Sequence, residues 1–151
     1  MVGLMNMKIN HELQGDETGC GIACVAMITG ATYHEVRQKM IEKKIIKDNS
    51  TNRRTRAKAL INILGEYSEE FTAQAIRKKK IKTWATIPSD LAIASTNQNS
   101  KNKYYHWVVF GRDEVGTYFL GPEKSNKKRI RKFIGKKAGW FIDVSTCTLS
   151  R

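Results

Sequence analysis

The 151-residue sequence lacks several features that would assign it to common protein classes. It has no run of 18 or more apolar residues, so no transmembrane helix is predicted. Its first ten residues, MVGLMNMKIN, contain no basic segment followed by an apolar core, and no secretory signal is predicted. We find no internal repeat and no linker-like segment. The length therefore predicts one domain over residues 1–151, large enough to bury a hydrophobic core.

Cysteine is also scarce. Three cysteines, at positions 20, 24 and 147, do not form the disulfide framework of a small secreted protein. They suit a reducing compartment, and we expect the protein in the cytoplasm of its own cell or delivered to that of a target cell. No cofactor is predicted. A zinc site from Cys20, Cys24 and His106 would lack a fourth ligand and the usual spacing, so no metal site is predicted.

Acidic residues are few relative to basic ones. Fourteen Asp and Glu oppose 27 Lys and Arg, which leaves a net charge of +13. A charge this large favours polyanions such as nucleic acid, anionic lipid or an acidic protein partner, although a solvated lysine-rich surface is an alternative explanation. Two clusters supply the candidate nucleic-acid-binding residues: Arg53, Arg54, Arg56, Lys78, Lys79 and Lys80.

The most informative segment is residues 13–29, LQGDETGCGIACVAMIT. The apolar run after Cys20 has no polar stripe, which predicts a helix buried on most sides. Cys20 falls in or just before the first turn, where unpaired N–H groups and the helix dipole favour a thiolate. Gly19 and Gly21 leave the sulfur approachable. This pattern favours a nucleophile over a merely buried cysteine, whereas Cys24, one turn further on, is expected to point inward.

The rest of the chain divides into helices followed by strands. Gly30 ends the first helix, and Thr32-Tyr33-His34-Glu35 has the form of a capping box that opens a second helix to about residue 41. A third helix is predicted over residues 53–64. Strands are predicted at 91–95, 104–110, 117–120, 129–134 and 140–144, with a turn over 111–116. Helices followed by an antiparallel sheet make an α+β fold.

His106 is the histidine best placed to act as a general base for Cys20. It lies in the predicted strand 104–110, whereas His11 and His34 fall where surface positions are expected. A nucleophilic cysteine requires a base within hydrogen-bond reach and donors directed at the developing oxyanion. A lone strand histidine is more often a packed residue, but the pairing with Cys20 favours catalysis here.

Gln14, the run from Cys20 to Ile28 and the His-Trp-Val-Val-Phe stretch at 106–110 together resemble the peptidase C39 family of papain-like cysteine peptidases. The pattern is similar to the domain that removes double-glycine leader peptides in bacteriocin-exporting ABC transporters. The resemblance implies a papain-like fold in which N-terminal helices pack on a C-terminal antiparallel sheet. It also implies that Cys20 attacks the scissile carbonyl of a peptide or protein, that His106 is the base and that Gln14 helps form the oxyanion hole. The candidate substrate-binding residues are Gly19, Gly21 and Trp107.

One position departs from the family pattern. An aspartate in an Asp-Pro pair on the next strand orients the histidine in the family, and this chain has Gly121-Pro122 there. Folding the hairpin about Asp113 and Glu114 places Gly121 opposite His106 and leaves Asp113 at the distant tip. Glycine cannot orient an imidazole, so either a Cys–His dyad operates or another group orients the base.

Three functions follow from these observations. The leading hypothesis is a cysteine peptidase that cleaves peptide bonds through a thioester acyl-enzyme. The alternative is an RNA-cleaving toxin of bacterial competition, directed at nucleic acid such as tRNA and using the same Cys–His pair. The basic clusters and the lost aspartate favour this alternative, and an acidic protein such as an inhibitor would be a suitable partner. The third is an inactive binding module, in which Cys20 and His106 would occur together by chance. It stays an alternative because a fold does not by itself determine function.

Overall fold

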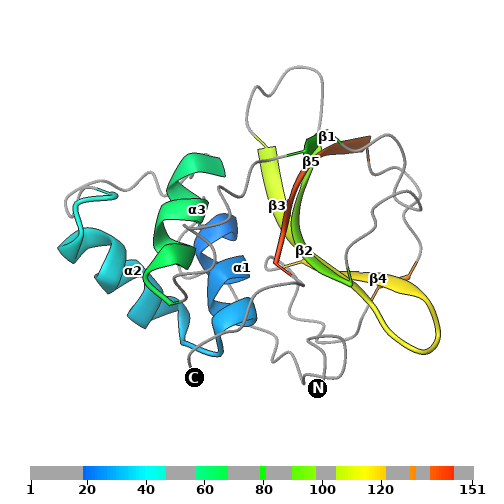
Figure 1. The fold of residues 1–151 in the computed structure, drawn as a ribbon, viewed down its shortest axis with the longest axis horizontal. Helices are drawn as coiled ribbons and strands as arrows, with labels where there is room; N and C mark the ends of the chain where they lie inside the picture. The colour runs from blue at the N-terminus through cyan, green and yellow to red at the C-terminus, as the bar shows by residue number, and fades with distance from the viewer. Residues whose placement is uncertain are drawn as a thin grey trace.

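The structure is a computed structural model that describes residues 19–46, 57–67, 79–80, 90–97, 105–121, 130–131 and 137–144. Its elements in chain order are α1 (Cys20–Thr29), α2 (Tyr33–Glu42), α3 (Ala57–Gly65), β1 (Lys79–Lys80), β2 (Leu91–Asn97), β3 (Tyr105–Arg112), β4 (Thr117–Leu120) and β5 (Lys137–Asp143). The helices gather on one side of a curved sheet (Figure 1). Helix α1 contacts β3 as well as both other helices. The predicted α+β fold, with N-terminal helices packed on an antiparallel sheet, is confirmed.

Helix α1 is the central element of the fold. All ten of its residues are buried, as the unbroken apolar run predicts. Its one polar residue after the cysteines, Thr29, satisfies its hydroxyl within the helix by donating to the Val25 carbonyl at 2.8 Å. Gly30 ends the helix in the left-handed conformation (φ 81°), and its N–H donates to the Ala26 carbonyl at 2.9 Å. Glycine adopts this conformation without steric cost, which explains the sharp stop.

The other two helices cover α1 on the side away from the sheet. The predicted capping box of α2 is confirmed: Glu35 N–H donates to Thr32 Oγ1 at 3.1 Å, and Thr32 N–H donates to Glu35 Oε2 at 3.0 Å. Within the predicted helix 53–64, the structure describes a helix from Ala57 to Gly65. The two helices turn these residues into the core: Tyr33, Val36, Met40, Leu60, Ile63 and Leu64.

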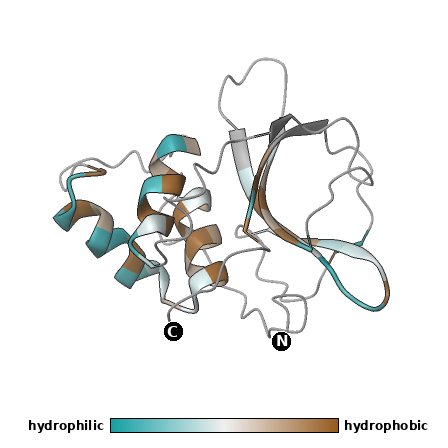
Figure 2. Ribbon diagram, in the orientation of Figure 1, coloured by the Kyte–Doolittle hydropathy of each residue, from teal (hydrophilic) through white to brown (hydrophobic). Residues whose placement is uncertain are grey.

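The sheet has the strand order β1-β5-β2-β3-β4, and every neighbouring pair is antiparallel. Side chains alternate between two buried faces, as the period of a strand requires. The face that packs with the helices carries Leu91, Ile93, Trp107, Val109, Tyr118, Leu120 and Ile142. The opposite face carries Ala92, Ala94, Val108, Phe110, Phe119 and Phe141. Hydrophobic colour accordingly concentrates on α1 and the middle of the sheet (Figure 2).

The β3–β4 hairpin differs from the predicted turn. Strand β3 continues through Gly111 and Arg112, and Arg112 N–H donates to the Asp90 carbonyl at 2.9 Å. The turn is therefore tighter than the predicted 111–116: Asp113 N–H and the Gly116 carbonyl lie 2.9 Å apart, which leaves two residues between them. Gly116 has a φ of 141°, a conformation that L side chains rarely adopt. The hairpin is centred between Glu114 and Val115, not between Asp113 and Glu114.

Two other strand predictions are partly tested. Strand β5 begins at Lys137, before the predicted residue 140, and ends at Asp143. In the predicted strand 129–134, Ile130 forms an isolated bridge with Phe119, and residues 129 and 132–134 lie outside the described part of the chain. No helix among the described residues combines the length and the apolar character required to span a membrane.

Candidate active site

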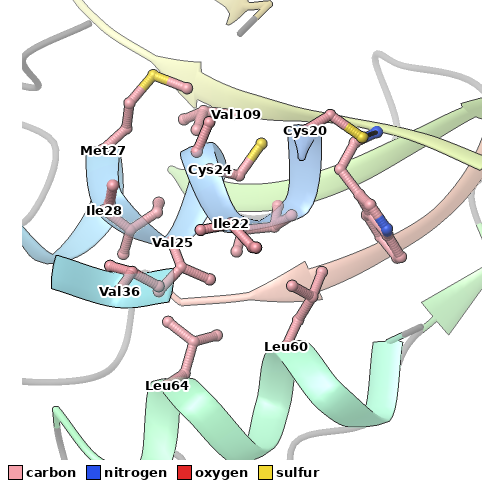
Figure 3. Close-up of a cluster of buried hydrophobic side chains, with 14 of the residues drawn as sticks. Cys20, Ile22, Cys24, Val25, Met27, Ile28, Val36, Leu60, Leu64 and Val109 are labelled. Carbon is pink, nitrogen blue, oxygen red and sulfur yellow. Dashed lines mark hydrogen bonds between the residues drawn. The ribbon is translucent and has the colours of Figure 1, made fainter. Parts of the chain in front are cut away.

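Cys20 is the first residue of α1 and lies against strand β3. The N-cap residue, Gly19, has no side chain with which to cap this helix end. The Cys20 Sγ accepts a hydrogen bond from the backbone N–H of Trp107 at 3.4 Å, across 87 positions of sequence. The cysteine is 8% exposed and stands at one end of the buried cluster that α1 forms with Leu60, Leu64 and Val109 (Figure 3). The start of α1 and the first half of β3 thus form one site.

Backbone geometry explains why the sulfur lies at this point of β3. Successive residues of a strand direct their N–H and C=O groups to alternate sides. Because Arg112 N–H points to Asp90, beside the start of β2, Trp107 N–H points to the side of β4. The last pair between β3 and β4 is Val109↔Leu120, so Trp107 lies beyond it. The Cys20 sulfur occupies the position that a longer β4 would take.

The predicted base lies directly beside this contact in the chain. His106 is in β3, one residue before Trp107, and its backbone pairs with Thr96 of β2. The structure describes the strand position of His106 but not its side chain. Gln14 lies outside the described residues. The structure therefore brings the strand position of His106 next to Cys20, and the roles of His106 and Gln14 stay predictions.

The two cysteines of α1 have different environments. Cys24 is completely buried, which confirms its expected inward position. Burial raises the pKa of the Cys24 thiol well above its ordinary value, and the charge of nearby Cys20 raises it further. Cys24 thus remains a neutral thiol at physiological pH, because a thiolate in an apolar interior is unfavourable. A thiolate nucleophile on this helix has to be Cys20.

The predicted substrate-binding residues are all buried. A Cβ atom at Gly19 would collide with the Tyr33 hydroxyl and lie 2.8 Å from the Tyr33 Cζ. This gives Gly19 a packing reason that the sequence reading missed, since the contact joins the starts of two different helices. Gly21 is inside α1, and the Trp107 side chain, 2% exposed, belongs to the core. Substrate binding by these residues stays a prediction.

The hairpin register corrects the expected place of Gly121. Because Val109 pairs with Leu120, Gly121 comes opposite Val108 and is a diagonal neighbour of His106. The prediction that Gly121 lies directly opposite His106 is wrong, since the turn is centred one residue later than expected. Asp113 is at the hairpin tip, as expected. Its carboxylate is held there by Arg131, at 2.6 Å and 2.9 Å.

The candidate nucleic-acid-binding residues are largely outside the described chain, including Arg53, Arg54, Arg56 and Lys78. Lys79 and Lys80 form β1 at one edge of the sheet. Strands β5 and β2 lie between β1 and β3, a separation of about 14 Å at the usual strand spacing. Strand β1 is therefore remote from β3, the strand that contacts the Cys20 sulfur. Among the described side chains, no group of three His, Cys, Asp or Glu is placed to hold a metal ion.

A cysteine at the start of a buried helix, packed against an antiparallel sheet, defines the papain-like class of α+β folds. The sequence model of the peptidase C39 family matches residues 8–133, which is most of the 151-residue chain and includes positions 14, 20 and 106. The chain belongs to the peptidase C39 family, a family of papain-like cysteine peptidases. A search of curated proteins found no significant match.

Proposed function

We propose that this protein is a cysteine peptidase with Cys20 as nucleophile, His106 as general base and Gln14 as a donor to the oxyanion. The observation that carries the proposal is the 3.4 Å contact between the Trp107 N–H and the Cys20 Sγ. This contact brings the first residue of α1 to the strand position next to His106. Membership of the C39 family supports the same chemistry at the level of the family.

The local electrostatics suit a nucleophilic sulfur. The first turn of a helix presents N–H groups without intrahelical partners, and the positive end of the helix dipole favours an anion there. The Trp107 N–H adds a hydrogen bond that is stronger to a thiolate than to a thiol. Cys24 stays neutral one turn away and therefore adds no competing charge. An imidazolium at His106 would stabilise the thiolate further.

The reaction proceeds in two steps. The Cys20 thiolate attacks the scissile carbonyl carbon, and the resulting oxyanion is stabilised by the Cys20 N–H and the Gln14 side-chain amide. The imidazolium of His106 gives its proton to the leaving amine as the C–N bond breaks, which leaves a thioester on Cys20. His106 then takes a proton from water, the hydroxide attacks the thioester, and the acid product leaves with regeneration of the thiolate.

The test uses matched pairs of variants on peptide substrates that include double-glycine sequences. Cys20→Ala and His106→Ala are compared with Cys24→Ala, a buried cysteine of the same helix, and with His34→Ala, an exposed histidine. We expect Cys20→Ala to lower turnover by at least about 10³-fold, as loss of a nucleophile does. His106→Ala should cause a comparable loss, and the two control variants should retain most of the activity. Mass spectrometry of the products identifies the cleaved bond.

The same proteins are incubated with total RNA to test the alternative function. Peptide cleavage that Cys20→Ala abolishes, with RNA left intact, supports the peptidase. RNA cleavage that Cys20→Ala abolishes would instead contradict it and support the nucleic-acid-directed toxin. Activity toward neither substrate in the wild-type protein would favour a binding module.

A further inference from the structure

Two consecutive residues at the start of α1 are held by different elements. Gly19 meets the side chain of Tyr33, the first residue of α2. Cys20 accepts a hydrogen bond from the backbone N–H of Trp107 in β3, with 3.4 Å between nitrogen and sulfur. Strand β3 and helix α2 both contact α1 and lie on opposite sides of it (Figure 3). The helix start that carries the proposed nucleophile is therefore held from two sides.

The Tyr33 ring meets Gly19 with its hydroxyl. A Cβ atom at Gly19 would collide with the hydroxyl oxygen and would lie 2.8 Å from Cζ and 2.9 Å from Cε2. Real Cβ atoms essentially never approach a neighbour this closely. The backbone of Gly19, with φ −90° and ψ 21°, has a conformation that other residues also adopt. The tip of the tyrosine, and not the backbone conformation, is thus what leaves no room for a side chain at position 19.

Tyr33 is itself fixed at both ends. Its backbone begins α2 within the capping box of Thr32 and Glu35, whose two hydrogen bonds measure 3.1 Å and 3.0 Å. Its side chain is buried in the same cluster as Cys20 and Trp107. Protein interiors are close-packed, so a displacement at one buried contact is passed to its neighbours. The hydroxyl is therefore a fixed point against which the residue before Cys20 rests.

The hydrogen bond on Cys20 depends on where α1 begins. Because Cys20 directly follows Gly19, a shift of the Gly19 backbone also moves the sulfur relative to the Trp107 N–H. Removal of the Tyr33 hydroxyl would leave a gap at Gly19, and even a small gap forfeits much of the contact energy of the atoms that line it. We propose that Tyr33 is a positioning residue for Cys20, its hydroxyl holding the sulfur against the Trp107 N–H. This inference rests on the proposed role of Cys20 as nucleophile.

The first test removes only the hydroxyl. Tyr33→Phe keeps the ring, and Tyr67→Phe is the matched control because the Tyr67 ring packs instead under Lys39, whose Nζ lies 4.3 Å from the ring centre. The measurement is the rate of Cys20 alkylation by iodoacetamide as a function of pH, with tandem mass spectrometry to separate Cys20 from Cys24. A thiolate with a weaker N–H hydrogen bond forms less readily. We therefore expect Tyr33→Phe to slow alkylation near neutral pH about three- to tenfold and to move the profile to higher pH. Tyr67→Phe should behave as the wild type does.

The second test adds a side chain at the same contact. Gly19→Ala places a Cβ where the Tyr33 hydroxyl lies, and we expect it to slow Cys20 alkylation by at least about threefold in the wild-type background. Tyr33→Leu shortens the side chain and makes room, so Gly19→Ala should cause little further change when added to Tyr33→Leu. Such coupling in a double-mutant cycle is expected of residues in contact. Every variant keeps His106 and Cys24, so a shift does not arise from the loss of a titratable group.

An unchanged alkylation profile in folded Tyr33→Phe would overturn the inference, even if the free energy of unfolding fell, since that indicates a purely structural contact. So would an equal shift in Tyr33→Phe and Tyr67→Phe, or an equal effect of Gly19→Ala in the wild-type and Tyr33→Leu backgrounds. Alkylation needs no turnover. Failure of the proposed function would appear separately, as peptide cleavage that survives Cys20→Ala.

Discussion

Two cysteines one helical turn apart have different environments in this protein. Cys20 is at the start of α1 and accepts a hydrogen bond from Trp107 N–H, whereas Cys24 is completely buried in the core. Burial disfavours the thiolate form of Cys24, and a negative charge at Cys20 disfavours it further. The same residue type is thus a candidate nucleophile at one position and a small apolar side chain at the next turn.

The raised pKa of Cys24 predicts a pH dependence of stability. Below about pH 9 the thiol is neutral in both the folded and the unfolded chain, so its full contribution to stability is present. Above that pH the unfolded chain releases the proton while the folded one does not. Relative to Cys24→Ala, the wild type should therefore lose about 1.4 kcal/mol of unfolding free energy per pH unit until the folded pKa is reached.

Urea denaturation of both proteins from pH 7 to pH 10 checks this expectation. The difference between the two proteins removes the titration of other groups, including Cys20, which both retain. Two stability curves that stay parallel over this range would contradict the raised pKa of Cys24.

At the scale of elements, α1 is positioned by the start of α2 as well as by β3. Tyr33, the first residue of α2, packs against Gly19 so closely that no Cβ fits there. The capping box of Thr32 and Glu35 fixes the same helix end. The cap therefore acts on the helix whose first residue, Tyr33, packs against the residue before Cys20.

Thr32→Ala should lower the free energy of unfolding by about 1 kcal/mol, because it removes the acceptor for the Glu35 N–H. Thr32→Ser retains that acceptor and is the matched control, with stability close to that of the wild type. Equilibrium urea denaturation measures both variants. A wild-type value for Thr32→Ala would show that the observed cap contributes nothing to stability.

At the scale of the whole molecule, the most unusual property is the net charge of +13. The described pair of lysines from the basic run, Lys79 and Lys80, forms the edge strand β1, separated from β3 by two strands. Lysines at a sheet edge also discourage pairing with other chains, which is a common structural use of charge. The presence of Lys79 and Lys80 in β1 is therefore explained without a polyanionic substrate at Cys20.

Salt dependence distinguishes these possibilities. We expect kcat/KM for a neutral peptide to change less than about threefold between 50 and 200 mM NaCl, because no counterions are released from such a substrate. Binding of single-stranded RNA that uses six or more phosphate contacts would instead weaken by about 300-fold or more over the same range. Fluorescence anisotropy measures the RNA arm. Steeply salt-dependent RNA cleavage that requires Cys20 would contradict the peptidase.

Much of the local structure followed from the sequence. The limits of α1, the capping box at Thr32 and the inward position of Cys24 depend on residues close together in the chain, and all three are confirmed. The hairpin was predicted with its turn in the wrong place, because the residues between Gly111 and Gly116 allow more than one centre. Only cross-strand pairing distinguishes these centres, and it moves Gly121 from opposite His106 to opposite Val108.

The sequence by itself determined the α+β order of elements, the buried helix and the candidacy of Cys20 and His106, because periodicity, caps and motif spacing are local properties. The tertiary structure decided which residues meet across the chain. The contact of Trp107 N–H with Cys20, the closeness of Tyr33 to Gly19 and the pairing of Thr96 with His106 have no sequence signature. Every residue except proline carries a backbone N–H, and register is set by the whole sheet, so these contacts exist only once the chain has folded.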